Sequence, residues 1–286
     1  MSAPTTGNVS SPAKKMTLNE AYKILDSTGV PDALHDARVL FRRFAGARDI
    51  DLIDRSFSSD SEELREAIAR RADREPLQYI IGEVDFYRES YLVDPSVLIP
   101  RQDTEILVDF AVKNIPEGKR FADLCCGSGC VGLSTLSNTK NTTAILADIS
   151  DGALAVARKN AERIGVKERA DFVLSDVLKE RVAEEVFAVL SNPPYVSEEA
   201  YAGLEPEIYR EPRIAFVGRE SGIEFYRKLT PMYKDVIAKD GFIAYEIGYD
   251  QADALAIIAE DNGMSSEILT DLSDNARVAV LRHKIH

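Results

Sequence analysis

The chain has 286 residues, which is more than one typical domain needs and comfortable for two. Its formal net charge of −13 disfavours a large non-specific nucleic-acid surface, because an acidic protein repels a phosphate backbone. No apolar run approaches the length of a membrane-spanning helix. Three cysteines make no disulfide framework, which is typical of the reducing cytoplasm. We therefore expect a cytoplasmic protein with no direct nucleic-acid partner and no membrane partner.

The N-terminal quarter of the chain consists of a polar leader followed by a helical region. Residues 1–15 are rich in Ser, Thr and Pro and have no apolar core, so we expect a disordered leader and not a secretory signal. Thr17 and Glu20 have the spacing of a capping box, and a later helical run ends at Gly46. Residues 16–75 are therefore predicted to form a small all-helical domain.

The residue composition and the hydrophobic pattern change after residue 75. Residues 76–100 are rich in Tyr, Val, Ile and Phe with turn residues between them, which predicts a β-hairpin linker. From residue 101 to 286 the pattern alternates between strand and helix. Alternation of this kind predicts an α/β domain with a largely parallel sheet and helices on both faces. The expected strands are residues 120–126, 142–148, 170–176, 186–192, 241–248 and 276–282. The expected helices are residues 129–137, 151–165, 221–240 and 251–263.

A glycine-containing loop follows the first strand of this domain. Gly127-Ser128-Gly129 leads into a helix, and glycines there let the backbone approach a ligand closely. Asp148 ends the next strand, where a carboxylate can accept hydrogen bonds from both hydroxyls of a ribose. Asp176 ends the third strand, where its side chain or backbone could reach an adenine edge. This arrangement predicts a nucleoside-containing cofactor.

Two cofactors fit these residues. Gly127, Gly129 and Gly132 also match a dinucleotide fingerprint, and Asp148 lies at a suitable distance for the 2′-hydroxyl of NAD. Asp123, just before the loop, favours S-adenosylmethionine, because an acid suits a cationic amino-acid moiety and does not suit a pyrophosphate. The three cysteines, Cys125, Cys126 and Cys130, lack a usual zinc spacing and have no histidine nearby, so we expect packing residues and no metal.

The segment Asn192-Pro193-Pro194-Tyr195 follows a strand that is predicted to be buried. An amide or exocyclic amino nitrogen is a poor nucleophile, because its lone pair is delocalised. The Asn192 side-chain oxygen and the Pro193 carbonyl could accept its two N–H groups, and proline keeps the loop stiff. The face of Tyr195 could cover the planar group. The motif predicts methylation of a planar nitrogen, and it suits adenine amino groups and glutamine amides alike.

The sequence resembles the HemK/PrmC protein-glutamine methyltransferases over nearly its whole length after the leader. The most specific stretch is Ile99-Pro100-Arg101-Gln102-Asp103-Thr104-Glu105. The other matching residues are Arg74 to Ile80, Gly82-Glu83, Phe86, Asp123 to Gly129, Asp148, Asn192 to Tyr195, Glu211-Pro212, Glu246, Gly248, Asp274-Asn275 and Arg277-Val278. The family's loop commonly opens with Gly, and Cys125 takes that place here.

The resemblance implies a Rossmann-like class I S-adenosylmethionine-dependent methyltransferase domain. Its expected reaction is methyl transfer to the glutamine amide in the Gly-Gly-Gln motif of peptide chain release factors, which are the expected partners, and its expected product is S-adenosylhomocysteine. The implied cofactor-binding residues are Asp123, Cys125, Cys126, Gly127, Ser128, Gly129, Asp148, Asp176, Val177 and Asn192. The implied catalytic and substrate-binding residues are Asn192, Pro193, Pro194 and Tyr195. The helical domain would help to dock the release factor to what we expect to be a monomer.

Three alternatives remain beside this interpretation. A sister enzyme that methylates a ribosomal-protein glutamine is the nearest, and the Asp-Thr-Glu at residues 103–105 argues against it. A DNA adenine methyltransferase would need a target-recognition domain and a basic groove, which the charge of −13 disfavours. The non-enzymatic alternative is a cofactor-binding interaction module, and the intact Asn192 motif argues against it.

Overall fold

The computed structural model describes residues 15–218 and 221–284. The chain forms two compact units, Met1–Ile81 and Gly82–His286. Except for Lys15, the predicted leader lies outside the described residues. No helix within the described ranges combines the length and the apolar character that crossing a membrane requires.

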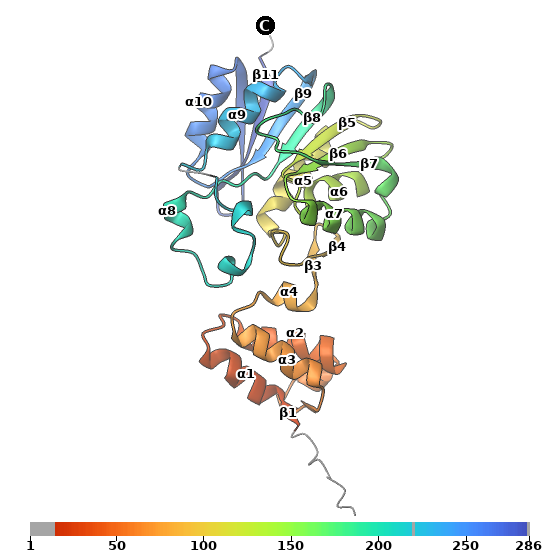
Figure 1. Cartoon of the computed structure of the whole chain (residues 1–286), viewed down its shortest axis with the longest axis vertical. Helices are drawn as coiled ribbons and strands as arrows, with labels where there is room; N and C mark the ends of the chain where they lie inside the picture. Colours follow the sequence, from red (N-terminus) through yellow and green to blue (C-terminus); the bar gives the residue numbers. More distant parts are fainter. Residues whose placement is uncertain (1–14, 219–220, 285–286) are drawn as a thin grey trace, which may run out of the picture. The chain divides into compact units, whose positions relative to one another are not determined.

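The first unit is built from short amphipathic helices (Figure 1). Its elements are β1 (Met16–Thr17), α1 (Leu18–Ser27), α2 (Ala33–Ala45), η1 (Asp49–Leu52), β2 (Ser58–Ser59), α3 (Glu62–Ala72) and α4 (Leu77–Ile81). The predicted capping box is present, with the Glu20 N–H donating to Thr17 Oγ1 at 3.1 Å. Leu25, Leu40 and Leu64 share one apolar core, which holds the helices together. The antiparallel pairing of β1 with β2 was not predicted from the sequence.

The second unit begins with a hairpin and continues with a seven-stranded sheet. Its elements up to the third sheet strand are β3 (Glu83–Phe86), β4 (Glu89–Leu92), η2 (Gln102–Thr104), α5 (Glu105–Asn114), β5 (Arg120–Leu124), α6 (Cys130–Ser137), β6 (Thr143–Asp148), α7 (Asp151–Ile164), η3 (Lys167–Arg169) and β7 (Ala170–Leu174). The remainder are β8 (Val186–Ser191), α8 (Glu198–Tyr201), η4 (Ile208–Arg210), η5 (Arg213–Ala215), α9 (Glu224–Tyr233), β9 (Ile237–Glu246), α10 (Ala252–Asp261), β10 (Met264–Thr270) and β11 (Ala276–His283).

The sheet order is β10-β11-β9-β8-β5-β6-β7. The strands β5 to β9 run parallel to one another, and β11 pairs antiparallel with both β9 and β10. The chain leaves β5 toward β6 and β7 on one side, and later fills the other side with β8 and β9. The strand order therefore reverses between β5 and β8, which is where ligands bind in open α/β sheets.

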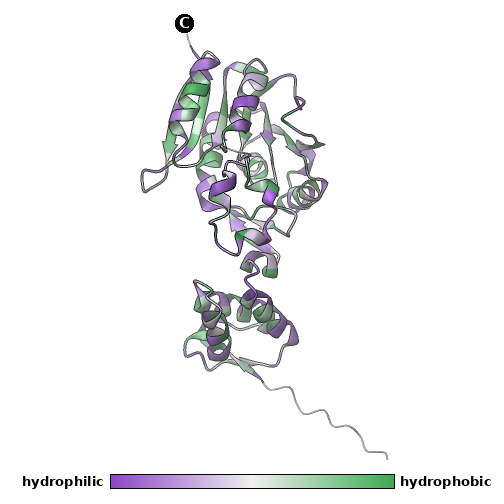
Figure 2. Ribbon diagram, turned by 60° about the vertical axis from the view of Figure 1, so that its left-hand side comes forward, coloured by the Kyte–Doolittle hydropathy of each residue, from purple (hydrophilic) through white to green (hydrophobic). Residues whose placement is uncertain are grey.

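Helices cover both faces of the sheet (Figure 1). One apolar cluster joins α5, α6 and α7 to side chains such as Phe121 and Leu190. The other joins α9 and α10 to side chains such as Leu124 and Val189. Neighbouring residues of one strand thus point to opposite faces, as a strand buried on both sides requires. Individual helices accordingly carry both hydrophobic and hydrophilic residues (Figure 2).

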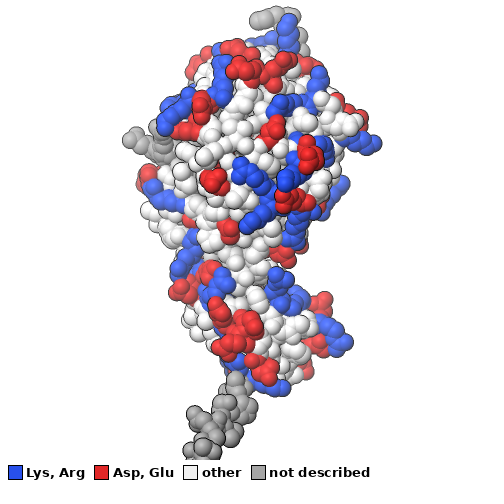
Figure 3. All heavy atoms as spheres, turned by 45° about the vertical axis from the view of Figure 1, so that its right-hand side comes forward, with Lys and Arg blue, Asp and Glu red and all other residues white. Residues whose placement is uncertain are grey.

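The second unit differs from the sequence prediction at several elements, of which α8 and the 3-10 helices are short. Helix α5 and strand β10 were not predicted, and the helix expected over residues 221–240 ends at Tyr233 because β9 begins at Ile237. Strand β10 is the edge strand, and most of its side chains are exposed or half-buried, so it lacks the apolar run that marks the central strands. On the face that Figure 3 shows, acidic and basic side chains are interspersed, without a continuous basic strip.

Candidate active site

Two loops meet at the point where the strand order reverses. Residues 125–129 follow β5, residues 192–195 follow β8, and β5 pairs with β8 up to Leu124 and Ser191. Beside them lies a cavity of about 280 Å³. Most of the predicted site residues line it, namely Asp123, Cys125, Cys126, Gly127, Ser128, Asp148, Asp176, Val177, Asn192 and Pro194. Gly129, Pro193 and Tyr195 do not line it.

The loop after β5 has a tight, left-handed backbone. Cys125, Gly127 and Gly129 have φ values of 60°, 54° and 81°. The turn is closed by the Gly129 N–H, which donates to the Cys126 carbonyl at 2.8 Å. A Cβ atom on Gly127 would meet nothing within 4 Å, so glycine at this position leaves room beside the backbone. Glycine adopts a left-handed φ more readily than any residue with a Cβ atom, so Cys125 stands at a position that favours glycine.

Asp123 is a buried carboxyl group on the floor of the cavity. Its side chain is 1% exposed, and its Oδ2 accepts a hydrogen bond from the Gly132 N–H of α6 at 2.8 Å. Burial raises the pKa of Asp123 to about 7, because the charged form is poorly solvated there. This carboxyl group therefore favours a positively charged ligand group, which would restore the solvation that burial removes.

Asp148 stands at the end of β6, as the prediction for a ribose ligand requires. Its Oδ2 accepts from the Gly127 N–H at 2.8 Å and its Oδ1 accepts from the Ser150 N–H at 2.9 Å. Burial raises the pKa of this carboxyl group, while the hydrogen bond from Gly127 lowers it. Each carboxylate oxygen has a second lone pair, so two ribose hydroxyls could still donate to it.

Asp176 and Val177 follow β7 on the wall of the cavity. Asp176 Oδ1 accepts from the Leu178 N–H at 3.1 Å, and its Oδ2 lies 2.8 Å from Lys179 Nζ. These contacts fix the carboxylate in a turn. Val177 is 4% exposed and presents an apolar surface. An apolar wall beside a fixed polar turn suits a planar heteroaromatic ring, such as the adenine that Asp176 is predicted to reach.

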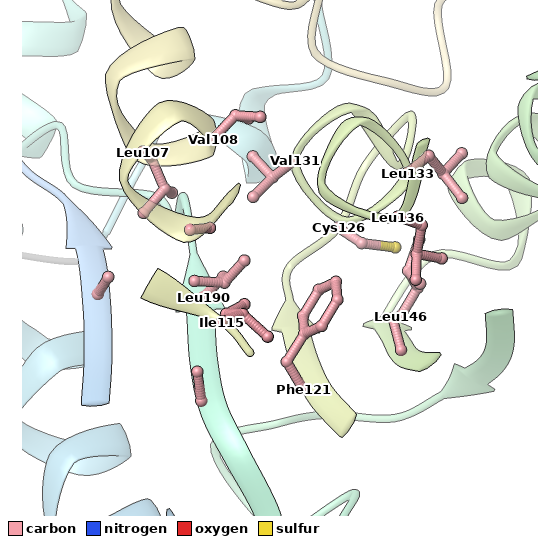
Figure 4. Close-up of a cluster of buried hydrophobic side chains, with 14 of the residues drawn as sticks. Leu107, Val108, Ile115, Phe121, Cys126, Val131, Leu133, Leu136, Leu146 and Leu190 are labelled. Carbon is pink, nitrogen blue, oxygen red and sulfur yellow. The ribbon is translucent and has the colours of Figure 1, made fainter. Parts of the chain in front are cut away.

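The three cysteines are free thiols. Cys126 points into the apolar cluster on the α6 side of the sheet, beside Phe121 and Leu136 (Figure 4). Cys125 and Cys130 are half-buried at the cavity. Burial raises the pKa of all three thiols, which keeps them protonated and unreactive. This environment agrees with their interpretation as small packing residues.

The loop after β8 is held by side chains from other parts of the unit. Asn192 Nδ2 donates to Thr104 Oγ1 at 3.3 Å, and Gln251 Nε2 donates to the Tyr195 carbonyl at 3.1 Å. A Cβ atom on Gly222 would lie 2.2 Å from the Tyr195 carbonyl oxygen, so only glycine allows that close approach. With Nδ2 turned to Thr104, the Asn192 Oδ1 is the acceptor that remains for a substrate.

Tyr195 and Glu246 form a buried pair behind this loop. The Tyr195 hydroxyl donates to Glu246 Oε1 at 3.1 Å, and Glu246 is 2% exposed. Burial raises the pKa of Glu246 to about 7. The phenol hydroxyl is bound to Glu246 and Tyr195 does not line the cavity, so the contact of its ring with a planar substrate group stays a prediction.

The stretch from Arg101 to Glu105 ties several elements to the site. Arg101 pairs with the buried Glu211, and Asp103 Oδ2 lies 3.0 Å from Arg277 Nη2. Glu105 Oε1 accepts from the Tyr87 N–H at 3.0 Å. The three charged side chains therefore make internal contacts, and Arg101 lines the cavity as well. Sequence reasoning did not single out Thr104, although it lies within the most specific stretch and anchors Asn192.

Comparison with known proteins identifies the family. Residues 17–82 match the PrmC N-terminal domain, and residues 102–208 match the methyltransferase small domain. A release factor glutamine methyltransferase from Clostridium acetobutylicum is 33% identical over 276 residues, which are 93% of this chain and 97% of that protein. The chain belongs to the release factor glutamine methyltransferase family. The protein of that name from Caulobacter vibrioides is 35% identical over 265 residues, or 90% of this chain and 91% of the relative.

Membership of the release factor glutamine methyltransferase family decides between the two cofactors in favour of S-adenosylmethionine. The residues of the cavity fit it, because Asp123 suits a cationic amino-acid group and Asp148 has lone pairs left for a ribose. Among solved structures, the tRNA m1G37 methyltransferase of M. jannaschii superposes with a TM-score of 0.50 at 16% identity, covering 71% of this chain and 57% of that one. At that identity the likeness shows the fold alone, which is the predicted Rossmann-like methyltransferase fold.

Proposed function

We propose that this protein transfers a methyl group from S-adenosylmethionine to the side-chain amide nitrogen of the glutamine in the Gly-Gly-Gln motif of peptide chain release factors. The relatives named for this activity match the chain over nearly its whole length. The observation that carries the proposal is the position of Asn192. It stands on the cavity beside the loop at residues 125–129, and its Nδ2 is already bound to Thr104.

The proposed chemistry depends on two acceptors that hold a planar amide. S-Adenosylmethionine supplies a methyl group on a sulfonium, which is a strong electrophile. Asn192 Oδ1 and the Pro193 carbonyl would accept the two N–H groups of the substrate amide and so fix the direction of its nitrogen. Proline has no N–H and a fixed φ, so the loop keeps the carbonyl in place. Most of the rate gain would come from this positioning.

The cofactor would lie in the cavity between Asp123 and Asp176. We assign the amino-acid portion to the side of Asp123, the ribose to Asp148, and the adenine to Asp176 and Val177. Residues 125–129 would pass directly beneath the cofactor, where Gly127 leaves room. We assign no metal to the reaction, because an activated methyl donor supplies the electrophile.

We also propose roles for the remaining parts of the chain. The helical unit, whose residues match the PrmC N-terminal domain, would dock the body of the release factor. Residues 76–100 would act as the connection between that unit and the catalytic residues 101–286. We expect the enzyme to act as a monomer in the cytoplasm, where translation termination takes place.

A labelling experiment tests the substrate. The protein is incubated with radiolabelled S-adenosylmethionine and, separately, with a release factor, its Gly-Gly-Gln to Gly-Gly-Ala variant, a ribosomal protein mixture and duplex DNA. We expect label on the intact release factor only. Label on the ribosomal proteins alone or on DNA alone would refute the proposed substrate, as would equal labelling of the Gly-Gly-Ala variant.

The variant Asn192→Ala tests the proposed role of the loop. It removes one of two acceptors for the substrate amide, and groups of this kind are worth about 100-fold or more in kcat. We expect such a loss while calorimetry shows the affinity for S-adenosylhomocysteine within about threefold of the wild type. Asn114→Ala, an exposed asparagine at the end of α5, is the control and should be as active as the wild type. Equal loss of cofactor affinity and activity in Asn192→Ala would indicate a structural role instead.

A further inference from the structure

A buried carboxyl group lies next to the catalytic loop without touching the cavity. Glu246 ends β9, and β9 pairs with β8 so that Tyr245 stands opposite Ser191, the residue before Asn192. Glu246 is 2% exposed. Its Oε1 accepts from the Tyr195 hydroxyl, and its Oε2 has no hydrogen-bond partner among the residues that the structure describes. Keeping a carboxyl group charged at this depth is costly, so its protonation depends on the few hydrogen bonds that reach it.

Thr104 connects this carboxyl group to Asn192. Its side chain is buried, with the residue 1% exposed, and its Oγ1 accepts the hydrogen bond from Asn192 Nδ2. A hydroxyl group has one proton, so Thr104 must direct that proton toward a different acceptor. The acceptor is the Glu246 carboxyl group, to which the Thr104 side chain is hydrogen-bonded, and this bond stabilises the charged form.

The direction of the hydrogen bonds from Asn192 through Thr104 to Glu246 determines which end of the Asn192 amide faces the substrate. An ionised carboxylate only accepts hydrogen bonds. It therefore accepts a hydrogen bond from the Thr104 hydroxyl and leaves the Thr104 oxygen to accept from Asn192 Nδ2. The Asn192 oxygen is then the atom that remains for a substrate N–H.

We propose that Glu246 is a positioning residue, which acts through Thr104 to hold the Asn192 amide with its oxygen turned to the substrate. This inference rests on the proposed function, because it assumes that Asn192 accepts a hydrogen bond from a substrate amide. When Glu246 is protonated, Thr104 is free to donate to Asn192 Oδ1 instead. The amide can then turn over, and its NH₂ group would face the NH₂ group of the substrate, where two donors repel.

The charged surroundings of Glu246 set the pH at which this happens. Burial has the largest effect and raises the pKa of Glu246. Hydrogen bonds from Thr104 and Tyr195 lower this pKa, Asp103 raises it and Arg277 lowers it, and the resulting pKa is about 7. The Tyr226 hydroxyl on α9 donates to the backbone carbonyl of Glu246. The carboxylate form predominates above that pKa, so the productive orientation of Asn192 should be gained as the pH rises through about 7.

The kinetic test compares four variants with the wild type between pH 6 and 8.5. They are Glu246→Gln, Thr104→Val, Thr104→Ser and the control Glu267→Gln, which changes an exposed glutamate on the edge strand β10. Saturating S-adenosylmethionine is used throughout, since Asp123 also has a pKa near 7 and would act on cofactor binding. The measured quantities are kcat for methyl transfer to the release factor and the dissociation constant of S-adenosylhomocysteine.

We expect kcat of the wild type and of Glu267→Gln to rise with pH through about 7. In Glu246→Gln this rise should be absent, because the amide does not titrate. Thr104→Val should lower kcat about 10-fold at pH 8, the effect of one hydrogen bond, and Thr104→Ser should restore it. The cofactor affinity should stay within about threefold in all variants. A rise through pH 7 that persists in Glu246→Gln, or equal kcat values for Thr104→Val and Thr104→Ser, would overturn the proposal.

A second measurement does not depend on the substrate. The side-chain carboxyl signal of Glu246 can be followed by NMR in protein labelled with ¹³C-glutamate and assigned with Glu246→Gln. We expect Thr104→Val to raise the pKa of Glu246 by about one unit, since it removes a hydrogen bond to the charged form. An unchanged pKa would refute the link between Thr104 and Glu246. Absence of label on every release factor would refute the proposed function, and the NMR result would still stand.

Discussion

Cys125 occupies a backbone position that favours glycine, and this predicts an unusual mutational effect. Its φ of 60° lies in the left-handed region, where a Cβ atom crowds the following carbonyl oxygen. The informative comparison is between Cys125→Gly and Cys125→Ala. Both variants remove the thiol, so the difference between them reports on the Cβ atom and the backbone.

The size of the effect follows from two opposing contributions. Alanine in the left-handed region costs roughly 1–2 kcal/mol that glycine avoids. Glycine loses more backbone entropy on folding, which costs roughly 0.5–1 kcal/mol relative to alanine. Cys125→Gly should therefore have a free energy of unfolding about 1 kcal/mol higher than Cys125→Ala. Cys125 packs beside the α9 and α10 cluster, so both variants also lose some contact with it.

Urea unfolding of the two variants measures this difference. The control is Ala256→Gly on the exposed side of α10, where the backbone is helical and glycine should lower the free energy of unfolding by about 1 kcal/mol. Glycine in place of alanine is thus expected to raise the free energy of unfolding at residue 125 and to lower it at residue 256. If Cys125→Gly is no more stable than Cys125→Ala, the left-handed strain at residue 125 is refuted.

Two further predictions concern the carboxyl groups of the cavity. Asp148→Ala should weaken S-adenosylhomocysteine binding at least about 10-fold in calorimetry by removing the ribose acceptors, and unchanged affinity would exclude that role. Asp123 has a pKa raised by burial, so its stabilising contribution is present at low pH and is lost as the pH rises through about 7. The free energy of unfolding of Asp123→Asn, relative to the wild type, should rise between pH 5 and pH 8 by on the order of 3 kcal/mol; parallel pH profiles would contradict this.

The central strands could be predicted from the sequence because they are buried on both faces. Residues 186–190 form an uninterrupted apolar run, and the structure has β8 over Val186–Ser191 with every side chain buried. The edge strand β10 was missed because its polar side chains face solvent and its pairing with β11 comes from the sheet and not from its own composition. Helix α5 was missed because it follows directly on the motif that ends at Glu105.

The position of the site could also be predicted, whereas its internal contacts could not. Asp148 ends β6 and Asn192 directly follows β8, and these two strands run parallel in one sheet. Strand order alone therefore brings both residues to the same edge. Thr104 reaches Asn192 across 88 positions of sequence, and no local pattern encodes that pairing. The sequence marks Glu246 only as one of the residues that carry the family resemblance, and its burial beside Tyr195 shows how it could act on the loop.

The contacts of residues 101–105 connect this stretch to more parts of the fold than the chemistry of the Asn192 motif requires. A loop that grips a planar nitrogen is useful to enzymes with different substrates. Residues 101–105 contact Glu211, Arg277 and Asn192, which lie on three segments far apart in the sequence. A change at one of these positions leaves a buried or half-buried partner without its hydrogen bond, which costs about 1–3 kcal/mol. The stretch is therefore constrained by several partners at once. The Asn192 motif alone indicates the chemistry, whereas residues 101–105 indicate the arrangement of the segments around it.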